Sequence, residues 1–165
     1  MIGIGIVIFV VIAVGWVLSR ARPGNEWLAK ERAPWVLRRA KLLLCEPKDM
    51  IRCTSPIKLH GRPDLVYSSW LNGLIVLETK TRMSEVYYPQ DILEMSVYKY
   101  ILEHGYGYRV SNYGFIRLVV GEYRPTIRYL KVRLLSSAAV EHVAGDYSSI
   151  RAGEYTPECV CGNCR

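Results

Sequence analysis

Acidic residues are in short supply in this chain. Its 165 residues include 15 Asp and Glu against 22 Lys and Arg, which gives a formal net charge of +7 and a pI of about 9.2. The sequence also lacks internal repeats and low-complexity blocks, so neither a repeat array nor a segment of biased composition is expected. The basic excess indicates an anionic partner, either nucleic acid or a lipid surface, although a well-solvated basic protein has the same balance.

Charge is absent from the first nineteen residues, MIGIGIVIFVVIAVGWVLS. At about 1.5 Å per residue a helix of this length spans ~28 Å, close to the ~30 Å of a bilayer core. No Lys or Arg precedes the run and no A-x-A-like site follows it, which argues against a secretory signal. Trp16 stands near its end, where an interfacial aromatic residue is expected. Residues 1–19 are therefore predicted to form a transmembrane anchor.

Basic residues follow this run directly, beginning with Arg20 and Arg22. The positive-inside rule therefore predicts a single-pass membrane protein with membrane lipid as a partner and its C-terminal body in the cytoplasm. A reducing cytoplasm disfavours structural disulfides. Metal or cluster ligation is thus the first expectation for any group among the five cysteines.

The rest of the chain is predicted to comprise a linker, residues 20–26, and one folded domain, residues 27–165. An amphipathic helix interrupted near Pro34 is expected at 26–44. Strands are predicted at 41–46, 56–61, 63–68, 74–80, 113–122 and 126–135, and helices at 88–107 and 136–154, the first of them ending at Gly105. This order indicates an α/β or α+β fold in which helices flank one mixed central sheet.

Asp64, Glu78 and Lys80 are the candidate reactive residues. Glu78 and Lys80 stand two apart in the apolar run LIVLETK, so in a strand they emerge from the same face. Asn72-Gly73 predicts a hairpin that brings Asp64 beside them. Two neighbouring carboxylates repel unless a cation lies between them, and oxygen ligands suit Mg²⁺ or Mn²⁺. The alternative is an exposed cross-strand salt bridge, which the apolar surroundings disfavour.

The segment Gly61-Arg62-Pro63-Asp64, the hairpin and Glu78-x-Lys80 resemble the signature of the PD-(D/E)XK nuclease superfamily. This resemblance covers residues 40–135 and the cysteine tail, and it implies a restriction-endonuclease-like core. It also implies that Asp64 and Glu78 hold the metal ion, that the Thr79 carbonyl adds a ligand and that Lys80 is catalytic.

The helix that follows is similar to that of the RecB-type branch, which carries a Gln-x-x-x-Tyr motif beyond the active-site strand. Tyr98 matches the tyrosine, but Glu94 stands where the branch has glutamine, and Gln90 lies one turn earlier. Glu94 and Tyr98 share a helix face and are assigned to the catalytic group. The family often has a further upstream metal ligand, for which Glu46 and Glu31 are the available candidates.

Three cysteines, Cys159, Cys161 and Cys164, crowd into the last seven residues. Together with a fourth thiolate they would form a four-sulfur site, for which soft metals are preferred. Cys53, in a turn-like stretch, is the predicted fourth ligand. Cys45 is the alternative, although it could instead be a small core residue. Resemblance to the CRISPR-associated branch of RecB-type nucleases implies a [4Fe–4S] cluster, with Zn²⁺ as the other option.

The leading prediction is a membrane-anchored, Mg²⁺- or Mn²⁺-dependent DNA nuclease, exonuclease-like on single-stranded or free ends. A basic surface would track the phosphate backbone. The alternative is a non-catalytic nucleic-acid-binding or assembly module of the same fold at the membrane, which Glu94 in place of glutamine favours. A sequence-specific restriction-type endonuclease is a third option, but the short chain leaves little room for a recognition domain.

Overall fold

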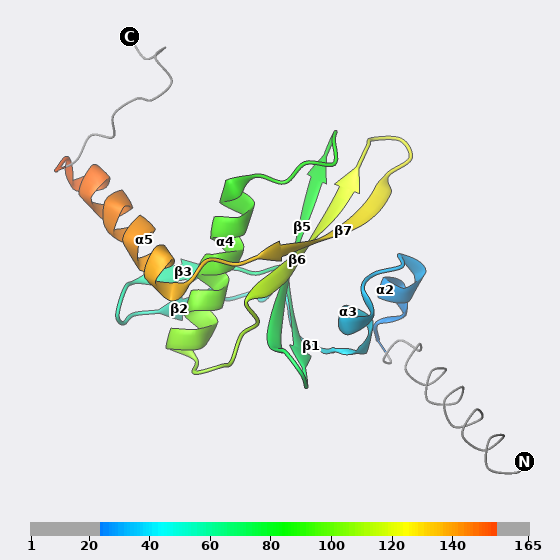
Figure 1. Cartoon of the computed structure of the whole chain (residues 1–165), viewed down its shortest axis with the longest axis horizontal. Coiled ribbons are helices and arrows are strands. Elements are labelled where there is room, and N and C mark those ends of the chain that lie inside the picture. The colour runs from blue at the N-terminus through cyan, green and yellow to red at the C-terminus, as the bar shows by residue number, and fades with distance from the viewer. Residues whose placement is uncertain (1–23, 155–165) are drawn as a thin grey trace, which may run out of the picture.

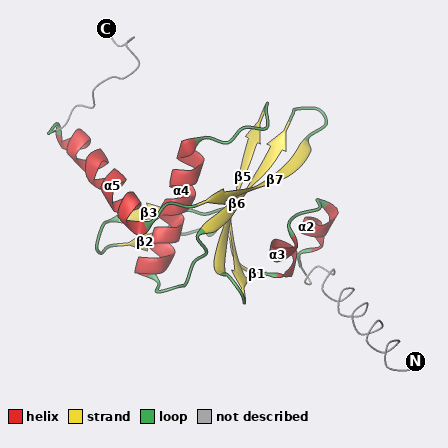
Figure 2. Cartoon of the chain, in the orientation of Figure 1, coloured by secondary structure: helices red, strands yellow, loops and turns green. Residues whose placement is uncertain are grey.

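A five-stranded mixed sheet is the centre of the computed structural model, which describes residues 24–154 (Figures 1 and 2). Its strand order is β1-β4-β5-β6-β7, and β2 pairs with β3 in a separate ribbon. The β5–β6 pair is parallel and the other pairs are antiparallel. The strands are β1 (Lys41–Cys45), β2 (Ile51–Cys53), β3 (Leu59–Gly61), β4 (Leu65–Ser69), β5 (Gly73–Arg82), β6 (Tyr113–Val120) and β7 (Thr126–Arg133). The helices are α2 (Glu26–Lys30), α3 (Trp35–Arg39), α4 (Pro89–Tyr100), the π-helix η1 (Ile101–Gly105) and α5 (Ser137–Ala152). The mixed α/β class with helices flanking one sheet is confirmed.

The apolar run of β5 is long because both faces of this strand are buried. Helices α4 and α5 and the β2–β3 ribbon lie on one side of the sheet, while α2 and α3 lie on the other (Figure 1). Val76 points into the core under α4, whereas Ile75 and Leu77 point into the core under α2 and α3. Successive strand residues alternate between faces, so each side takes every second residue of this run.

The predicted hairpin is present: Ser69 pairs with Gly73, and Leu65 pairs with Leu77. Gly73 has a φ of +72°, and its Cα lies so close to the Arg109 carbonyl that a Cβ would be 2.3 Å from that oxygen. Glycine tolerates both conditions, which explains the strength of the Asn72-Gly73 turn signal.

The helix expected over 88–107 changes character along its length. It is α-helical from Pro89 to Tyr100 and then continues as the π-helix η1. The helix ends at Gly105 as predicted, but the reason for a glycine there is not capping, since the cap is Tyr106. A Cβ at position 105 would instead lie 2.7 Å from the Arg52 carbonyl oxygen. Gly105 therefore permits close packing of η1 against β2, a strand that the sequence patterns did not predict.

The N-terminal helix is interrupted at Pro34 as predicted, which leaves the short helices α2 and α3. Asn25 is buried, and its side-chain amide donates to the carbonyls of Leu37, Arg38 and Ala40 at 3.2, 3.3 and 2.7 Å. This residue was expected in the linker at 20–26, but it joins the two short helices and belongs to the folded part.

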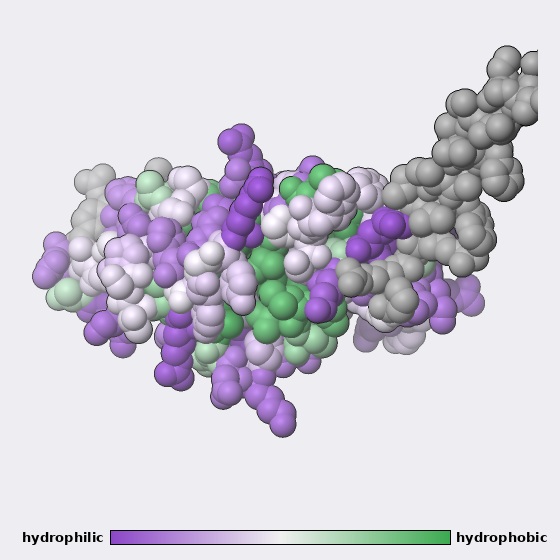
Figure 3. All heavy atoms as spheres, turned by 90° about the horizontal axis from the view of Figure 1, so that it is seen from below, coloured by the Kyte–Doolittle hydropathy of each residue, from purple (hydrophilic) through white to green (hydrophobic). Residues whose placement is uncertain are grey.

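The predicted anchor, residues 1–19, lies outside the described residues. Within residues 24–154, no helix has the length and apolar character needed to cross a bilayer. An apolar area is nevertheless exposed near the middle of the face that is seen from below (Figure 3).

Candidate active site

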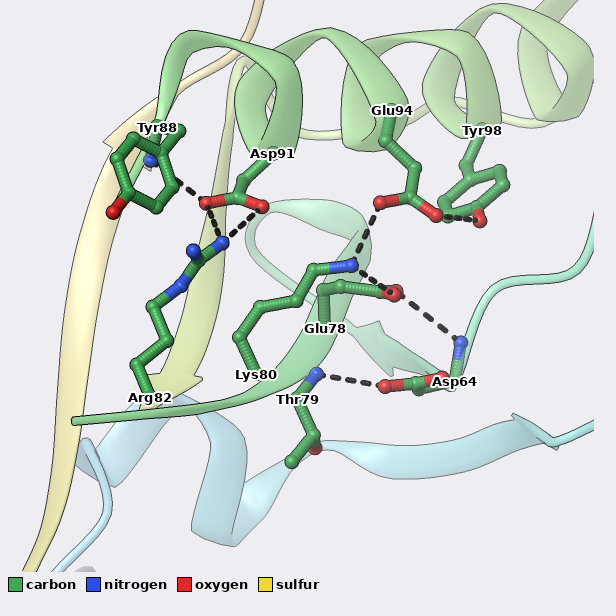
Figure 4. A network of polar contacts seen from close by, with 9 residues as sticks. All are labelled: Asp64, Glu78, Thr79, Lys80, Arg82, Tyr88, Asp91, Glu94 and Tyr98. Atoms are coloured by element: carbon green, nitrogen blue, oxygen red, sulfur yellow. Dashed lines mark hydrogen bonds and ion pairs between the residues drawn. The ribbon is translucent and has the colours of Figure 1, made fainter. Parts of the chain in front are cut away.

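The two predicted metal-binding carboxylates meet at the start of β4. Asp64 directly precedes Leu65, which pairs with Leu77, and this register places Asp64 beside Glu78. The Thr79 backbone N–H donates to Asp64 Oδ2 at 2.7 Å, and the Asp64 N–H donates to Glu78 Oε2 at 3.4 Å (Figure 4). The hairpin therefore brings together two acidic residues that are fourteen positions apart.

Lys80 joins the same group, as its spacing from Glu78 predicts. Its Nζ lies 3.1 Å from Glu78 Oε1 and 2.7 Å from Glu94 Oε2. Burial lowers the pKa of Lys80, but the hydrogen bond to Glu94 and the charge of Glu78 outweigh this and raise it overall. The ammonium is therefore held in its charged form between two carboxylates.

Helix α4 supplies the remaining members, Glu94 and Tyr98. The Tyr98 hydroxyl donates to Glu94 Oε1 at 2.8 Å, so one carboxylate bridges the phenol and the Lys80 ammonium (Figure 4). Burial and then this hydrogen bond raise the pKa of Tyr98, which keeps the hydroxyl protonated as a donor. The i, i+4 spacing of the two residues predicts this contact correctly.

The backbone of Gly61 packs directly against the ring of Tyr98. A Cβ at this position would lie 2.4 Å from Tyr98 Cε1, closer than any side-chain contact allows. The sequence pattern marks Gly61 as part of the lead-in to Asp64, but its contact with a residue 37 positions later could not be anticipated.

Glu78 occupies an unfavourable electrostatic position. Its side chain is only 5% exposed. Burial and, after it, the neighbouring Asp64 charge raise the pKa of Glu78, and Lys80 lowers it in part, with a net rise to about 7. A positive charge placed next to both carboxylates would favour their ionised forms.

This donor set fits Mg²⁺ or Mn²⁺. Among residues 24–154, no three His, Cys, Asp or Glu side chains form a metal-binding cluster. Mg²⁺, however, is usually held by one or two carboxylates, with waters and substrate phosphate filling its other positions. Asp64 and Glu78 supply two. Thr79, predicted to contribute its carbonyl, contacts Asp64 through its N–H, and its role as a ligand stays a prediction.

The two candidates for an upstream ligand have different partners. Glu31 packs on the far face, where Arg117 Nε donates to it at 2.8 Å and the Tyr129 hydroxyl also donates. The suggestion that Glu31 is a metal ligand is therefore wrong. The Glu46 N–H donates to the Asp64 carbonyl at 2.7 Å, which places the Glu46 backbone next to that of Asp64, and its role as a ligand stays a prediction.

Arg82 and Asp91 form an ion pair that was not predicted. Arg82 Nη2 contacts both Asp91 oxygens at 2.7 Å, and Asp91 also accepts the Tyr88 N–H at 2.8 Å (Figure 4). The available signal was the alternation of residues 78, 80 and 82 along one strand, which places Arg82 on the face that α4 covers.

The two cysteines proposed as a fourth cluster ligand differ in setting. Cys53 was expected in a turn, but it ends strand β2, is buried, and its Sγ lies 2.9 Å from the Ser55 carbonyl oxygen. Cys45 is exposed on β1, so its interpretation as a core residue is wrong. Cys159, Cys161 and Cys164 lie outside the described residues.

The solved structures that resemble this chain include the following two. The crystal structure of SSO0001 is 18% identical over 73% of this chain and 56% of its own, with a TM-score of 0.44. A provisionally assigned exonuclease from Eubacterium rectale is 16% identical over 85% of this chain and 56% of its own, with a TM-score of 0.48. This chain thus spans about half the length of each. At these values neither likeness bears on its activity. No family model and no curated protein matches the chain.

Proposed function

We propose that the chain is a metal-dependent deoxyribonuclease of the PD-(D/E)XK type, which acts on single-stranded or free DNA ends. Residues 27–165 form its nuclease domain, and residues 1–19 anchor it to the membrane with the domain in the cytoplasm. The observation that carries the activity is the adjacency of Asp64 and Glu78, linked by the Asp64 N–H at 3.4 Å, with the Lys80 ammonium 3.1 Å from Glu78.

Each residue of the site has a defined task. Asp64 and Glu78 would hold the divalent ion, which would supply Lewis-acid polarisation of the scissile phosphate and activation of a water molecule. The Thr79 N–H fixes the orientation of Asp64 by occupying one of its oxygens. The Lys80 ammonium stabilises the negative charge that develops on the phosphate oxygens. Glu94 and Tyr98 position Lys80 from the side of α4.

Cleavage of labelled DNA by the full chain in detergent tests this function. Single- and double-stranded substrates are incubated with Mn²⁺, with Mg²⁺ or with a chelator. We expect cleavage that requires the metal and falls about 10²–10³-fold in Glu78→Gln and Lys80→Met, the usual cost of losing one electrostatic group. Glu85→Gln is the matched control because Glu85 pairs with Arg128 on an exposed surface. Equal cleavage by all four proteins would refute the site.

The second candidate is a non-catalytic nucleic-acid-binding module of the same fold. It is favoured by the 2.7 Å contact between Lys80 and Glu94, because a second carboxylate beside Lys80 offsets charge that would otherwise act on the phosphate. Salt-dependent DNA binding without cleavage under any metal, and unaltered by Glu78→Gln, would select this function.

We also propose that the cysteine tail binds a metal, with Cys53 or Cys45 as the fourth ligand to a [4Fe–4S] cluster or Zn²⁺. Anaerobically purified full chain should absorb in the visible blue region if the cluster is iron–sulfur, and Cys161→Ser should abolish the band. Comparison of Cys53→Ser with Cys45→Ser identifies the fourth ligand. A colourless protein containing zinc would select Zn²⁺, and a metal-free tail would refute both.

A further inference from the structure

The end of the sheet that carries the β4–β5 hairpin exposes an apolar patch, which we call the hairpin rim. It comprises Trp70 and Leu71 at the hairpin tip, which are 91% and 48% exposed, and Leu42 and Leu43 on β1, which are 37% and 41% exposed. Lys41 pairs with Ser68, so the first half of β1 lies next to the hairpin tip. Figure 3, the view from below Figure 1, shows a hydrophobic area near the middle of this face, with hydrophilic residues along part of its border.

Folding of the domain does not account for this patch. Trp70 contributes almost no surface to either core, since nine-tenths of it is exposed. Contiguous apolar surface with a polar border is typical of a binding face for protein or membrane. The rim therefore has the character of a binding face for a partner outside the domain.

The path of the chain points to that occupant. Helix α3 ends at Arg39, two residues before β1, and the described chain begins beside it at the same end as the hairpin (Figure 1). The nineteen-residue uncharged run precedes this point in the sequence. An anchor formed by that run would hold the hairpin rim close to the bilayer.

Charge around the rim agrees with this placement. Lys41 and Arg109 are exposed, and the Arg109 carbonyl accepts the Leu74 N–H at 2.8 Å, which fixes Arg109 beside the hairpin tip. Tryptophan and leucine flanked by basic residues are the composition of a surface that rests on anionic headgroups.

We propose that the hairpin rim contacts an anionic lipid bilayer, with Trp70 inserted at the headgroup level. This inference rests on the proposed anchoring by residues 1–19 and is independent of the nuclease activity. The opposite end of the sheet provides an internal control. Because β6 runs parallel to β5, the β6–β7 loop lies at the far end from the hairpin tip, and Tyr123 on that loop is 92% exposed.

Tryptophan quenching by lipid tests the contact in the full chain. The protein is reconstituted in vesicles of phosphatidylglycerol and brominated phosphatidylcholine, and its fluorescence is compared with that in unbrominated vesicles. Subtraction of Trp70→Phe from the wild type isolates the Trp70 signal from the other three tryptophans. The double variant Trp70→Phe with Tyr123→Trp moves an equally exposed reporter to the opposite end.

We expect the Trp70 signal to be quenched and the reporter at position 123 to be unaffected. A Trp70 signal that brominated lipid leaves unchanged, or equal quenching at both positions, would overturn the contact. If added DNA shields Trp70 from quenching, the rim binds DNA in place of lipid, and the proposed contact is overturned as well. Vesicle flotation tests the anchor separately. If the protein floats with the vesicles but Trp70 is not quenched, the anchor is supported and the rim contact is refuted. If the protein does not float, both are refuted. Neither result bears on the nuclease activity, which the DNA cleavage assay tests separately.

Discussion

Glu94 on α4 and Lys80 on β5 form a 2.7 Å ion pair that ties the helix to the strand carrying the proposed site. Lys80 is 22% exposed and Glu94 is 40% exposed, so the pair lies at the border between the core and solvent. A group in this position can be reached by a substrate phosphate while still being held by the protein.

The ion pair predicts different outcomes for two substitutions at position 94. Glu94→Gln keeps a polar side chain within reach of Lys80 and Tyr98 but removes the negative charge that offsets the Lys80 ammonium. DNA cleavage by this variant should therefore be retained or increased. Glu94→Ala removes both contacts, and cleavage should fall about tenfold because Lys80 is no longer oriented. Single-turnover rates measure both. Similar losses in the two variants would show that the negative charge itself is needed.

Gly61→Ala should destabilise the domain because its Cβ would lie 2.4 Å from Tyr98 Cε1. We expect a cost of about 1–3 kcal/mol in the free energy of unfolding, typical of an overpacked site. Urea denaturation provides the measurement. In the Tyr98→Ala background the same substitution should cost less than about 0.5 kcal/mol, since the clash is absent. An undiminished cost in that background would place the strain elsewhere.

The two ion pairs of Arg82 with Asp91 and of Arg128 with Glu85 should differ in strength. Asp91 is 4% exposed, whereas Glu85 is 54% exposed. Asp91→Ala leaves Arg82 partly buried without its partner and should cost about 2–4 kcal/mol, somewhat below the loss for a fully buried pair. Glu85→Gln should change stability by less than about 1 kcal/mol. Thermal unfolding distinguishes them, and equal shifts would contradict this ranking.

Acid should weaken the contact between Glu31 and Arg117 on the far face of the sheet. The hydrogen bond from Arg117 holds the pKa of Glu31 below its ordinary value, although burial opposes this effect. A lowered pKa in the folded state stabilises the protein above the unfolded pKa of about 4.5, and this contribution is lost as the pH falls through the folded value. Glu31→Gln should therefore be less stable than the wild type at pH 7, with a smaller difference at pH 3. A gap independent of pH would exclude this linkage.

Local patterns predicted much of the fold and the convergence of the site. Alternation along β5 and the Asn72-Gly73 turn together determine that Asp64, Glu78 and Lys80 share one side, because strand period and hairpin register act over short distances. Spacing on α4 similarly predicts the Glu94–Tyr98 contact.

Contacts between distant segments were not predictable in this way. Three contacts join residues that are too far apart in the sequence to leave a local signal. They are the pairing of β5 with β6, the packing of Gly61 against Tyr98, and the Arg117–Glu31 contact. Cys53 was misplaced because its three-residue strand is too short to show alternation, and it is buried by contact with η1.

The length of β5 has a consequence for a nuclease at a membrane. From Gly73 beside the hairpin tip to Lys80 the strand advances seven residues, or about 23 Å at ~3.3 Å per residue. The Debye length at physiological ionic strength is only about 8 Å. With the tip at the headgroups and the strand upright, a DNA phosphate at Lys80 would be screened from the negative charge of the lipids. The strand would thus act as a spacer that lets one polyanion be cut next to another without repulsion between them.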